Sequence, residues 1–486
     1  MPNTPLTETN KTEFLDTNLK LGFTYYYKII SKSTDKLSQP SSIISSTPNT
    51  TPSKILIFGA KTGEDSQVTL KWEEPQWGNP IIGYKIFKST SSNVPTNTEP
   101  YVSVSHTASE YIDTNVSNGT TYYYKILAYN SLGNGQPSYE IFAKPIASSY
   151  ESSDYLFVDS NYDSEEKGSK AKPYKTISAA ISAADDNGII VILDGTYNLS
   201  TSLSKPLTIR SEYNHYALSN VIINPNTDNK VFVLNNGING VNIEGLNLKG
   251  IIWMAHSSSG SNINIRFNNM DVGAMAIDLV SNTQTRQNYK IIGNKIKTTS
   301  ASAMTVFGLY DSDILDNEIV STNYGGILCD KAININIKDN IIQNTPEQGI
   351  QIAGDANNVI VENNFIEKAN LNNTADKGCI RLYGSGFSGT VNIKNNILKN
   401  CYNGIAIRSG QNIKDKNIII ENNVILENSN LGVYYNNYNN SDTYGTLNVT
   451  HNYWNHPLGP KHLNNPDGNG EKLEDSVTFI PFKNRP

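Results

Sequence analysis

The sequence predicts an all-β chain in which a β-sandwich precedes a parallel β-helix, a solenoid of stacked strand-turn-strand coils. The main observation is a repeated motif between residues 260 and 455: an apolar residue, two variable residues, an asparagine, one variable residue and a second apolar residue. The motif recurs every 23 to 32 residues. Such a period, with apolar residues alternating inside each unit, indicates coils that share one core. The anchoring asparagines are Asn268, Asn294, Asn317, Asn340, Asn364, Asn396, Asn423 and Asn452.

The repeated unit is a β unit rather than a helical one. Isoleucine and valine are frequent in its segments, for example INIKDNIIQ, VIVENNFIE and VNIKNNILK, and each segment breaks at polar residues that tolerate turn backbone. Leucine-rich repeats have a similar period, but they need leucine at nearly every apolar site and a helical return segment, and neither is present. A second short strand follows most units, so we expect two or three parallel strands per coil.

The repeated asparagines have a mechanical role in this prediction. Stacked coils place identical amides about 4.8 Å apart along the axis. At that spacing the amides can hydrogen-bond to one another, as in other in-register strand stacks. We therefore predict a structural asparagine ladder and not a set of ligands.

Composition and charge restrict the partners. The chain has 486 residues, a mean hydropathy of −0.41 and a formal net charge of −6. It has no basic run that could follow a phosphate backbone, so nucleic acid is not an expected partner. The sequence contains no stretch of eighteen apolar residues, so we expect no membrane-spanning helix.

The three cysteines, Cys329, Cys379 and Cys401, show no metal-type spacing, and their odd number predicts no disulfide framework. Cys329 falls on an inward strand position and is expected to act as a small core hydrophobe.

The first 150 residues contain an internal duplication. FLDTNLKLGFTYYYKIISKSTDKLSQPS, from residue 14, and YIDTNVSNGTTYYYKILAYNSLGNGQPS, from residue 111, align without a gap at an offset of 97. The second copy belongs to a complete module over residues 52–145, in which Trp72 and an alternating strand from Tyr122 to Ala128 suggest a sandwich. The first copy, residues 1–48, is only the C-terminal half of such a module.

The complete module resembles a fibronectin type III domain, an immunoglobulin-like β-sandwich. The resemblance lies in the tryptophan of the second strand, in NGTTY, which looks like a tyrosine corner at Tyr122, and in the AYNSLG ending. It implies a spacer or weak binder in an extracellular multidomain protein, and we expect the spacer.

The half module leads to an expectation about the N-terminus. Two or three strands alone are marginally stable. Either Met1 is therefore an internal methionine of a longer polypeptide, which we favour, or the missing strands are supplied elsewhere. A secretion signal would then lie outside this sequence. We expect an extracellular or cell-surface location, for a monomer or a part of a longer polypeptide.

A short serine-containing linker, residues 146–154, leads to the predicted β-helix, residues 155–486. Near its start Ile177, Ala180, Ile181 and Ala184 are spaced as on one face of a helix. Such a helix would cap the first coil and protect its unpaired backbone.

Residues 155–486 resemble the right-handed parallel β-helix proteins of the pectate lyase-like superfamily. The resemblance lies in YLFVDSN…KPYKTISAAISAA…IIVILDGTY, in NGVNIEGLNLKG and in the closing VTHNYWNHPLGPKHLNN. It implies a right-handed solenoid with polymeric carbohydrate along its side. The superfamily includes enzymes and noncatalytic proteins, so the resemblance alone does not fix an activity.

Candidate site residues must face outward from the strands. With Ile350 and Ile352 of GIQIAG inward, Gln351 points out. The equivalent residues of neighbouring coils are Asp278, Leu328, Arg381, Ala406 and Tyr434, and two residues further along are Asp330, Tyr383, Arg408 and Asn436. Carboxylates thus occur on earlier coils, and guanidinium groups with tyrosines on later ones.

The resemblance implies roles for these residues. Lyases of the superfamily cleave uronic-acid polymers by β-elimination, usually with calcium held by acidic side chains, while a lysine or arginine removes the proton next to the sugar carboxylate. Asp278 and Asp330 are the expected calcium ligands. Arg381, Arg408 and Lys331 are the candidates for base or carboxylate clamp, although an arginine base needs a strongly positive setting. Gln351, Tyr383 and Tyr434 are expected to bind substrate.

Other side chains have weaker patterns. His451, His456 and His462 are spaced by five and six residues, which fits no helical zinc-ligand pair. Five residues could serve either as sugar-stacking platforms or as core fillers, namely Trp253, His256, Tyr434, Tyr435 and Tyr438.

Two functions remain open. The first is a polysaccharide lyase-like enzyme acting on a uronic-acid-containing polysaccharide. The second is a noncatalytic surface or adhesive protein that binds glycan in the same groove or forms a rigid stalk. The string DPH of the superfamily's alginate epimerases is absent, and the string NTD of its hydrolases occurs only at residues 226–228, before the repeated motif begins. Scattered charge on a strand is often only solvated surface.

Overall fold

The structure of the chain is a computed structural model. It describes residues 8–14, 16, 24–34, 36–46, 48–226, 228–255, 258–280, 286–320, 322–383, 389–408, 413–414, 416–435, 447–474 and 477–483.

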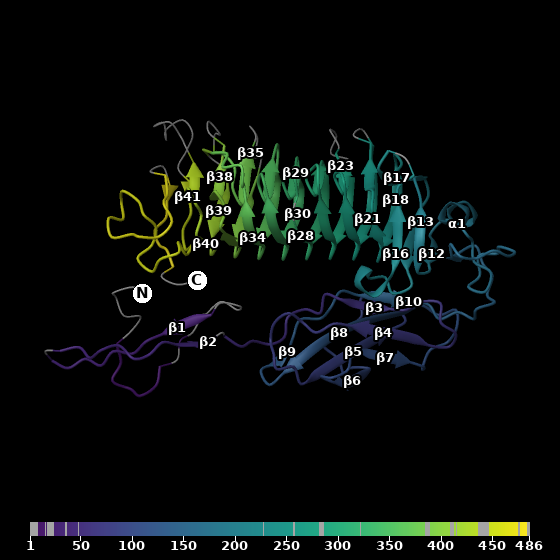
Figure 1. The fold of residues 1–486 in the computed structure, drawn as a ribbon, viewed down its shortest axis with the longest axis horizontal. Coiled ribbons are helices and arrows are strands. Elements are labelled where there is room, and N and C mark those ends of the chain that lie inside the picture. The colour runs from purple at the N-terminus through teal and green to yellow at the C-terminus, as the bar shows by residue number, and fades with distance from the viewer. Residues whose placement is uncertain are drawn as a thin grey trace.

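Three parallel sheets run the length of the C-terminal part and confirm the predicted β-helix (Figure 1). Each coil contributes one strand to each sheet. Sheet I contains β11 (Tyr155–Val158), β12 (Gly188–Ile192), β15 (Leu207–Ser211), β18 (Ile238–Glu244), β21 (Gly260–Arg266), β24 (Arg286–Ile292), β27 (Leu309–Leu315), β30 (Ile333–Lys338), β33 (Asn357–Glu362), β36 (Val391–Lys394) and β39 (Ile418–Glu421). Sheet II contains β13 (Gly195–Asn198), β16 (Val221–Asn224), β19 (Asn247–Leu248), β22 (Asn269–Val272), β25 (Lys295–Thr298), β28 (Glu318–Val320), β31 (Ile341–Thr345), β34 (Phe365–Ala369), β37 (Ile397–Lys399) and β40 (Val424–Leu426). Sheet III contains β14 (Thr201–Leu203), β17 (Lys230–Leu234), β20 (Ile251–Met254), β23 (Ile277–Leu279), β26 (Met304–Phe307), β29 (Ile327–Asp330), β32 (Ile350–Ala353), β35 (Ile380–Tyr383), β38 (Asn403–Ile407) and β41 (Leu431–Tyr435).

The predicted asparagine ladder lies at the turn between sheets I and II. Each amide nitrogen donates to the side-chain oxygen of the next asparagine, as from Asn317 to Asn340 (3.0 Å) and from Asn340 to Asn364 (2.9 Å). The same oxygen also accepts the backbone N–H of the preceding asparagine, and the amide nitrogen donates again to a carbonyl of the coil before, such as Ile314 O. The eight side chains are buried and hydrogen-bonded from Asn268 to Asn452. The ladder therefore holds the backbone of consecutive coils in register.

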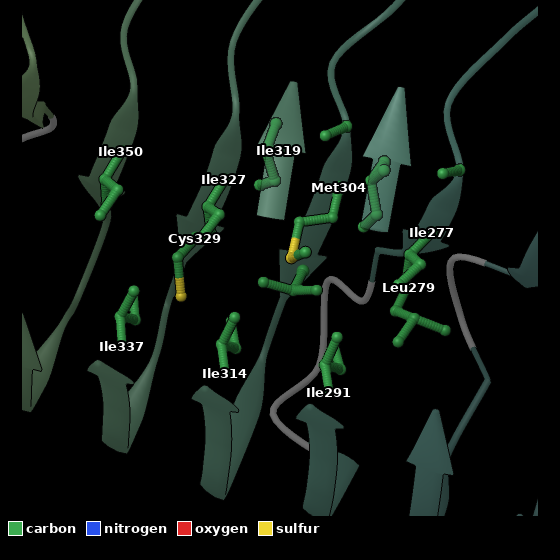
Figure 2. Close-up of a cluster of buried hydrophobic side chains, with 14 of the residues drawn as sticks. Ile277, Leu279, Ile291, Met304, Ile314, Ile319, Ile327, Cys329, Ile337 and Ile350 are labelled. Carbon is green, nitrogen blue, oxygen red and sulfur yellow. The ribbon is translucent and has the colours of Figure 1, made fainter. Parts of the chain in front are cut away.

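Stacked rows of aliphatic side chains fill the space between the three sheets. Figure 2 shows such rows, among them Ile291, Ile314 and Ile337 of sheet I on successive coils. Cys329 points into the same core and is completely buried, and burial raises the pKa of its thiol to about 12. The thiol is thus a core hydrophobe, as predicted.

The other two cysteines correct the sequence analysis. Cys379 and Cys401 form a disulfide, with their Cα atoms 5.7 Å apart. The expectation of no disulfide framework overlooked this single bond, because 22 residues are close to one coil length and place the two thiols on neighbouring coils.

The N-terminal cap is the predicted helix. Helix α1 (Ile177–Ala183) begins at Thr176, whose hydroxyl accepts the backbone N–H of Ala179. Ile177 and Ala180 are buried in the solenoid core, so the helix covers the first coil, as Figure 1 shows. In the part of the chain that the structure describes, no helix has the length and apolar character needed to cross a membrane.

The C-terminal segment covers the opposite end. It includes β42 (Leu447–Asn448) and β43 (Val477–Thr478), and Trp454 is fully buried beneath it. The backbone N–H of Gly432 donates to Lys472 O (2.8 Å), so the segment pairs with the last strand of sheet III. Glu471 is also buried, and its carboxylate accepts the backbone N–H of Asn428 (3.1 Å). Burial raises the pKa of Glu471 to about 7.

The predicted sandwich is present in residues 52–145. One sheet contains β3 (Phe58–Ala60), β4 (Val68–Trp72) and β7 (Glu110–Asp113), and the other contains β10 (Ile141–Ala143), β8 (Tyr122–Asn130), β5 (Gly83–Ser89), β6 (Val102–Ser105) and β9 (Gly133–Asn134). Trp72 and Tyr84 pack edge to face in the core with ring centroids 5.4 Å apart. The Tyr122 hydroxyl accepts the backbone N–H of Ser117 (3.0 Å), which confirms the tyrosine corner.

The sandwich is docked along the β-helix (Figure 1). Arg210 of β15 is completely buried, and it donates to Phe142 O (2.8 Å) and Ala60 O (3.2 Å) of the sandwich. Four coils further on, Asp316 binds the Lys54 ammonium (2.8 Å) and also accepts the Tyr139 hydroxyl.

The docked interface includes the start of the predicted linker. Ile146 packs with Tyr155, Phe157 and Val191 in a small buried cluster. The two parts are therefore held together by buried polar and apolar contacts.

Residues before the sandwich form a separate two-stranded hairpin of β1 (Tyr25–Tyr27) and β2 (Ile44–Ser46). Part of the predicted half module, including Gly22, lies outside the described residues.

We predict that Asn340→Ala lowers the free energy of unfolding by about 4 kcal/mol. The change removes the acceptor of the buried Asn317 N–H and a donor to Ile314 O, each at a cost of about 1–3 kcal/mol. It also removes one of the two donors to Asn364 Oδ1, which keeps the backbone N–H of residue 340. Guanidinium titration measures the loss. The matched control is Asn336→Ala, because Asn336 lies on the outer face of the adjoining strand and, among the described residues, its side chain donates to Asp313 alone. If the two variants lost equal free energies of unfolding, the asparagine ladder would not be a special source of stability.

The C-terminal cap should lose stability as pH rises. The folded protein keeps a proton on Glu471 up to about pH 7, whereas an unfolded carboxyl releases it near 4.5. The stabilisation from this proton is complete below pH 4.5, is lost as pH rises through 7, and amounts to roughly 3 kcal/mol.

Hydrogen exchange of the Gly432 amide, corrected for intrinsic rates, measures this loss between pH 5 and pH 8. Glu471→Gln should remove the pH dependence, and the exposed Asp467→Asn should retain it. An unchanged dependence in Glu471→Gln would assign the effect to another group.

Candidate functional site

The outer face of sheet III carries the predicted site residues in the predicted register. Gln351 pairs with Leu328 on one side and with Arg381 on the other, and the row continues through Ala406 to Tyr434. Asp278 belongs to the same row at the other end, separated from Leu328 by Thr305. The period-2 argument therefore predicted this register, although Ala406 is completely buried within the row.

Four of the predicted residues come together in one group. The Arg381 guanidinium lies 4.3 Å from the centroid of the Tyr383 ring, and the Arg408 guanidinium lies 4.5 Å from it. Arg381 Nη1 donates to Gln351 Oε1 (3.0 Å). We name Gln351, Asp376, Arg381, Tyr383 and Arg408 the arginine–tyrosine cluster.

The two arginines of the cluster differ in environment. Arg381 is nearly buried, and it is bound to Asp376 through its carboxylate (2.6 Å) and its backbone carbonyl (3.0 Å). Arg408 is exposed, and in the described part of the chain no carboxylate pairs with it. Arg381 therefore orders the group, whereas the charge of Arg408 is available to a ligand.

Asp376 was missed by the sequence analysis. It lies in a loop of the coil that separates Asn364 from Asn396 by 32 residues, the longest interval in the ladder. Buried Asn370 shapes this loop by donating to Thr374 O and Lys377 O. Asn403 of β38 donates to the carbonyls of Ala375 and Lys377. The long interval was the signal that an extra loop reaches the sheet.

Asp330 and Lys331 lie two coils before Tyr383. Asp330 pairs with Ala353, which pairs with Tyr383. Burial raises the pKa of Asp330, and one carboxylate oxygen has no hydrogen-bond partner among the described residues. Gly354 is needed beside it, because a Cβ there would lie 2.0 Å from that oxygen. The cluster and this carboxylate are thus neighbouring but separate features of the face.

The two expected calcium ligands lie on strands that are not adjacent. Asp278 is on β23 and Asp330 on β29, with β26 between them. Within the described ranges, no group of three histidine, cysteine or acidic side chains has a metal-binding arrangement. A calcium ion bound by these two side chains stays a prediction.

The aromatic candidates divide between surface and core. Trp253 is half-buried on sheet III with the Lys230 ammonium 4.0 Å from its ring centroid, and Tyr434 is half-buried at the other end of the row. Tyr435 is completely buried and fills the core. His256, Tyr438 and Asn436 lie outside the described residues.

The histidine candidates lie in the C-terminal segment. His451 is exposed there and His456 is half-buried. His462 is buried and packs edge to face on Phe479, with ring centroids 4.9 Å apart. His462 Nδ1 accepts the backbone N–H of Asn464 (3.0 Å), so this ring has a structural environment.

Comparisons with known families agree with the two-part architecture. Residues 52–144 match the family profile of the fibronectin type III domain, and residues 283–453 match that of the right-handed beta helix region. A solved structure, the sixth fibronectin type III domain from human fibronectin type III domain containing protein 3, is 16% identical. The match covers 22% of this chain and 97% of that one, with a TM-score of 0.18.

Curated relatives match over limited regions. A Kelch domain-containing protein of Saccharolobus solfataricus is 34% identical over 139 residues, which are 28% of this chain and 18% of that protein. An amylopullulanase of Thermoanaerobacter thermohydrosulfuricus is 38% identical over 85 residues, which are 17% of this chain and 5% of the enzyme. The chain thus spans less than a fifth of the length of these two relatives.

Proposed function

Because the chain joins a fibronectin type III domain to a right-handed parallel β-helix, we propose that it is an extracellular carbohydrate-binding protein. Sheet III would bind an acidic polysaccharide such as a uronic-acid polymer. The single observation that carries the proposal is the arginine–tyrosine cluster, in which Arg408 is exposed and held against the Tyr383 ring.

The chemistry of Arg408 favours an anionic ligand. A guanidinium presents a planar set of donors that matches a carboxylate in two parallel hydrogen bonds. Contact with Tyr383 orders the Arg408 side chain before a ligand arrives, which reduces the entropy lost on binding. The charge of Arg381 is already satisfied by Asp376, so the cluster offers one ordered cation.

The arrangement of the molecule supports binding along sheet III. The sandwich is docked at the corner between sheets I and II, through Arg210 and Asp316. In Figure 1 the strands β23, β29 and β35 of sheet III lie on the far side from the sandwich. A polymer could therefore lie on this face, from Trp253 past Gln351 to Tyr434, without meeting the docked module.

A lyase is the second candidate, favoured by the cation Lys331 beside the half-buried Asp330. β-Elimination needs a base at the carbon next to the carboxylate that is being neutralised. Lys331 follows β29 and Arg408 follows β38, three coils apart, which is about 14 Å at 4.8 Å per coil. Arg381 is held by Asp376. The candidate base Lys331 and the candidate carboxylate clamp Arg408 are thus too far apart to act on one sugar, which supports binding over cleavage.

Affinity for polygalacturonate, measured by isothermal titration, tests the binding proposal. Arg408→Gln should weaken binding at least tenfold, equivalent to about 1.4 kcal/mol, and raised salt should weaken the wild type. The matched control is Lys290→Gln, an exposed lysine on the outer face of sheet I, which should bind normally. Equal affinity for the carboxyl-reduced neutral polymer would overturn the proposal.

The same polymers, with and without calcium, test the lyase. We expect no rise in the ultraviolet absorbance of unsaturated products. A rise that Lys331→Gln and Arg408→Gln each abolish would establish cleavage instead, and dependence of that rise on Asp278 and Asp330 would assign the calcium.

A further inference from the structure

The hairpin of β1 and β2 reproduces two strands of the complete sandwich at the offset of the sequence duplication. Tyr27 pairs with Ile44 and Tyr25 with Ser46. Adding 97 to the first pair gives Tyr124 and Ile141, which are partners in β8 and β10. The hairpin thus has both the sequence and the strand register of the back half of a fibronectin type III domain.

A side-chain hydrogen bond repeats at the same offset. The Tyr27 hydroxyl donates to Asp16 Oδ2 (3.1 Å), and the Tyr124 hydroxyl donates to Asp113 Oδ2 (2.8 Å). In the complete module this bond is buried at the end of β7, where it ties one sheet to the other. The half module therefore retains a contact that serves the interior of a two-sheet structure.

The burial of equivalent residues differs sharply. Ile126 is 0% exposed in the complete module, whereas its equivalent Ile29 is 70% exposed. Ile141 is 1% exposed, and its equivalent Ile44 is 62% exposed. Side chains that form a core in one copy thus lie on the surface in the other, although a hairpin alone is only marginally stable.

The complete module shows what covers this face. Strand β5 pairs with β8 from Gly83 to Ser89, and Ile86 lies opposite Ile126. The Lys88 ammonium of β5 binds Asp113 at 2.7 Å. In the described residues β1 pairs with β2 alone, so its other edge is open to a strand of the same kind.

We propose that residues 24–46 are a docking surface for the three-stranded front half of a fibronectin type III domain, equivalent to β3, β4 and β5. The arriving strand equivalent to β5 would pair with Tyr26 to Lys32 and place an aliphatic residue against Ile29. A tryptophan equivalent to Trp72 would fill the core.

A chimera of the full chain tests this proposal. A copy of residues 52–97 is joined directly to Met1, because residue 98 of the complete module is the equivalent of residue 1 at the offset of 97. The added segment should complete the sandwich. Hydrogen exchange of the amides in Tyr25–Tyr27 and Ile44–Ser46 should then slow at least tenfold relative to the unmodified chain.

Three controls keep the outcome decisive. Ile29→Asp in the chimera, and Trp72→Ala in the added copy alone, should each restore fast exchange, and a scrambled copy should give no protection. Amides of β8 report that the native module remains folded in every variant. Fast exchange in the chimera, or equal protection by the scrambled copy, would overturn the docking surface.

Discussion

The buried asparagine ladder is the constraint on which the β-helix depends. Each amide bonds to the side chain and the backbone of the adjacent coil, so a slip of one residue at any turn would leave several buried polar groups unpaired. Because side chains alternate along a strand, such a slip would also exchange core and surface. The ladder therefore determines which side chains reach the outer face of sheet III.

The sequence predicted the features that follow from periodicity. Gln351, Arg381 and Tyr383 could be placed on one face because each coil repeats the same inward and outward positions. Asp376 could not, because it belongs to a loop whose path is set by Asn370 and Asn403 and not by the repeat. The disulfide was missed for a related reason: counting cysteines ignored that one coil length brings positions 379 and 401 together.

The docking of the sandwich on the β-helix could not be predicted from the sequence repeat either. The contacts of Arg210 are with backbone carbonyls of Ala60 and Phe142, which carry no sequence signature. A buried arginine is tolerated there because carbonyl oxygens accept its N–H groups. Separating the sandwich from the β-helix would take two of these acceptors away from the guanidinium. The interface thus favours one orientation of the two parts and leaves sheet III uncovered.

On sheet III, Arg381 orders the arginine–tyrosine cluster, whereas Arg408 is the arginine that is available to a ligand. A cation fully paired with a carboxylate has little attraction left for an acidic polymer, and Arg381 with Asp376 is such a pair. Arg408 shares the same aromatic ring without that neutralisation. The neutralised arginine holds Tyr383 in place, and Tyr383 in turn positions the arginine that remains charged. A rigid coil stack can in this way present a single oriented cation, a feature suited to recognising a carboxylate at a fixed place along a polymer.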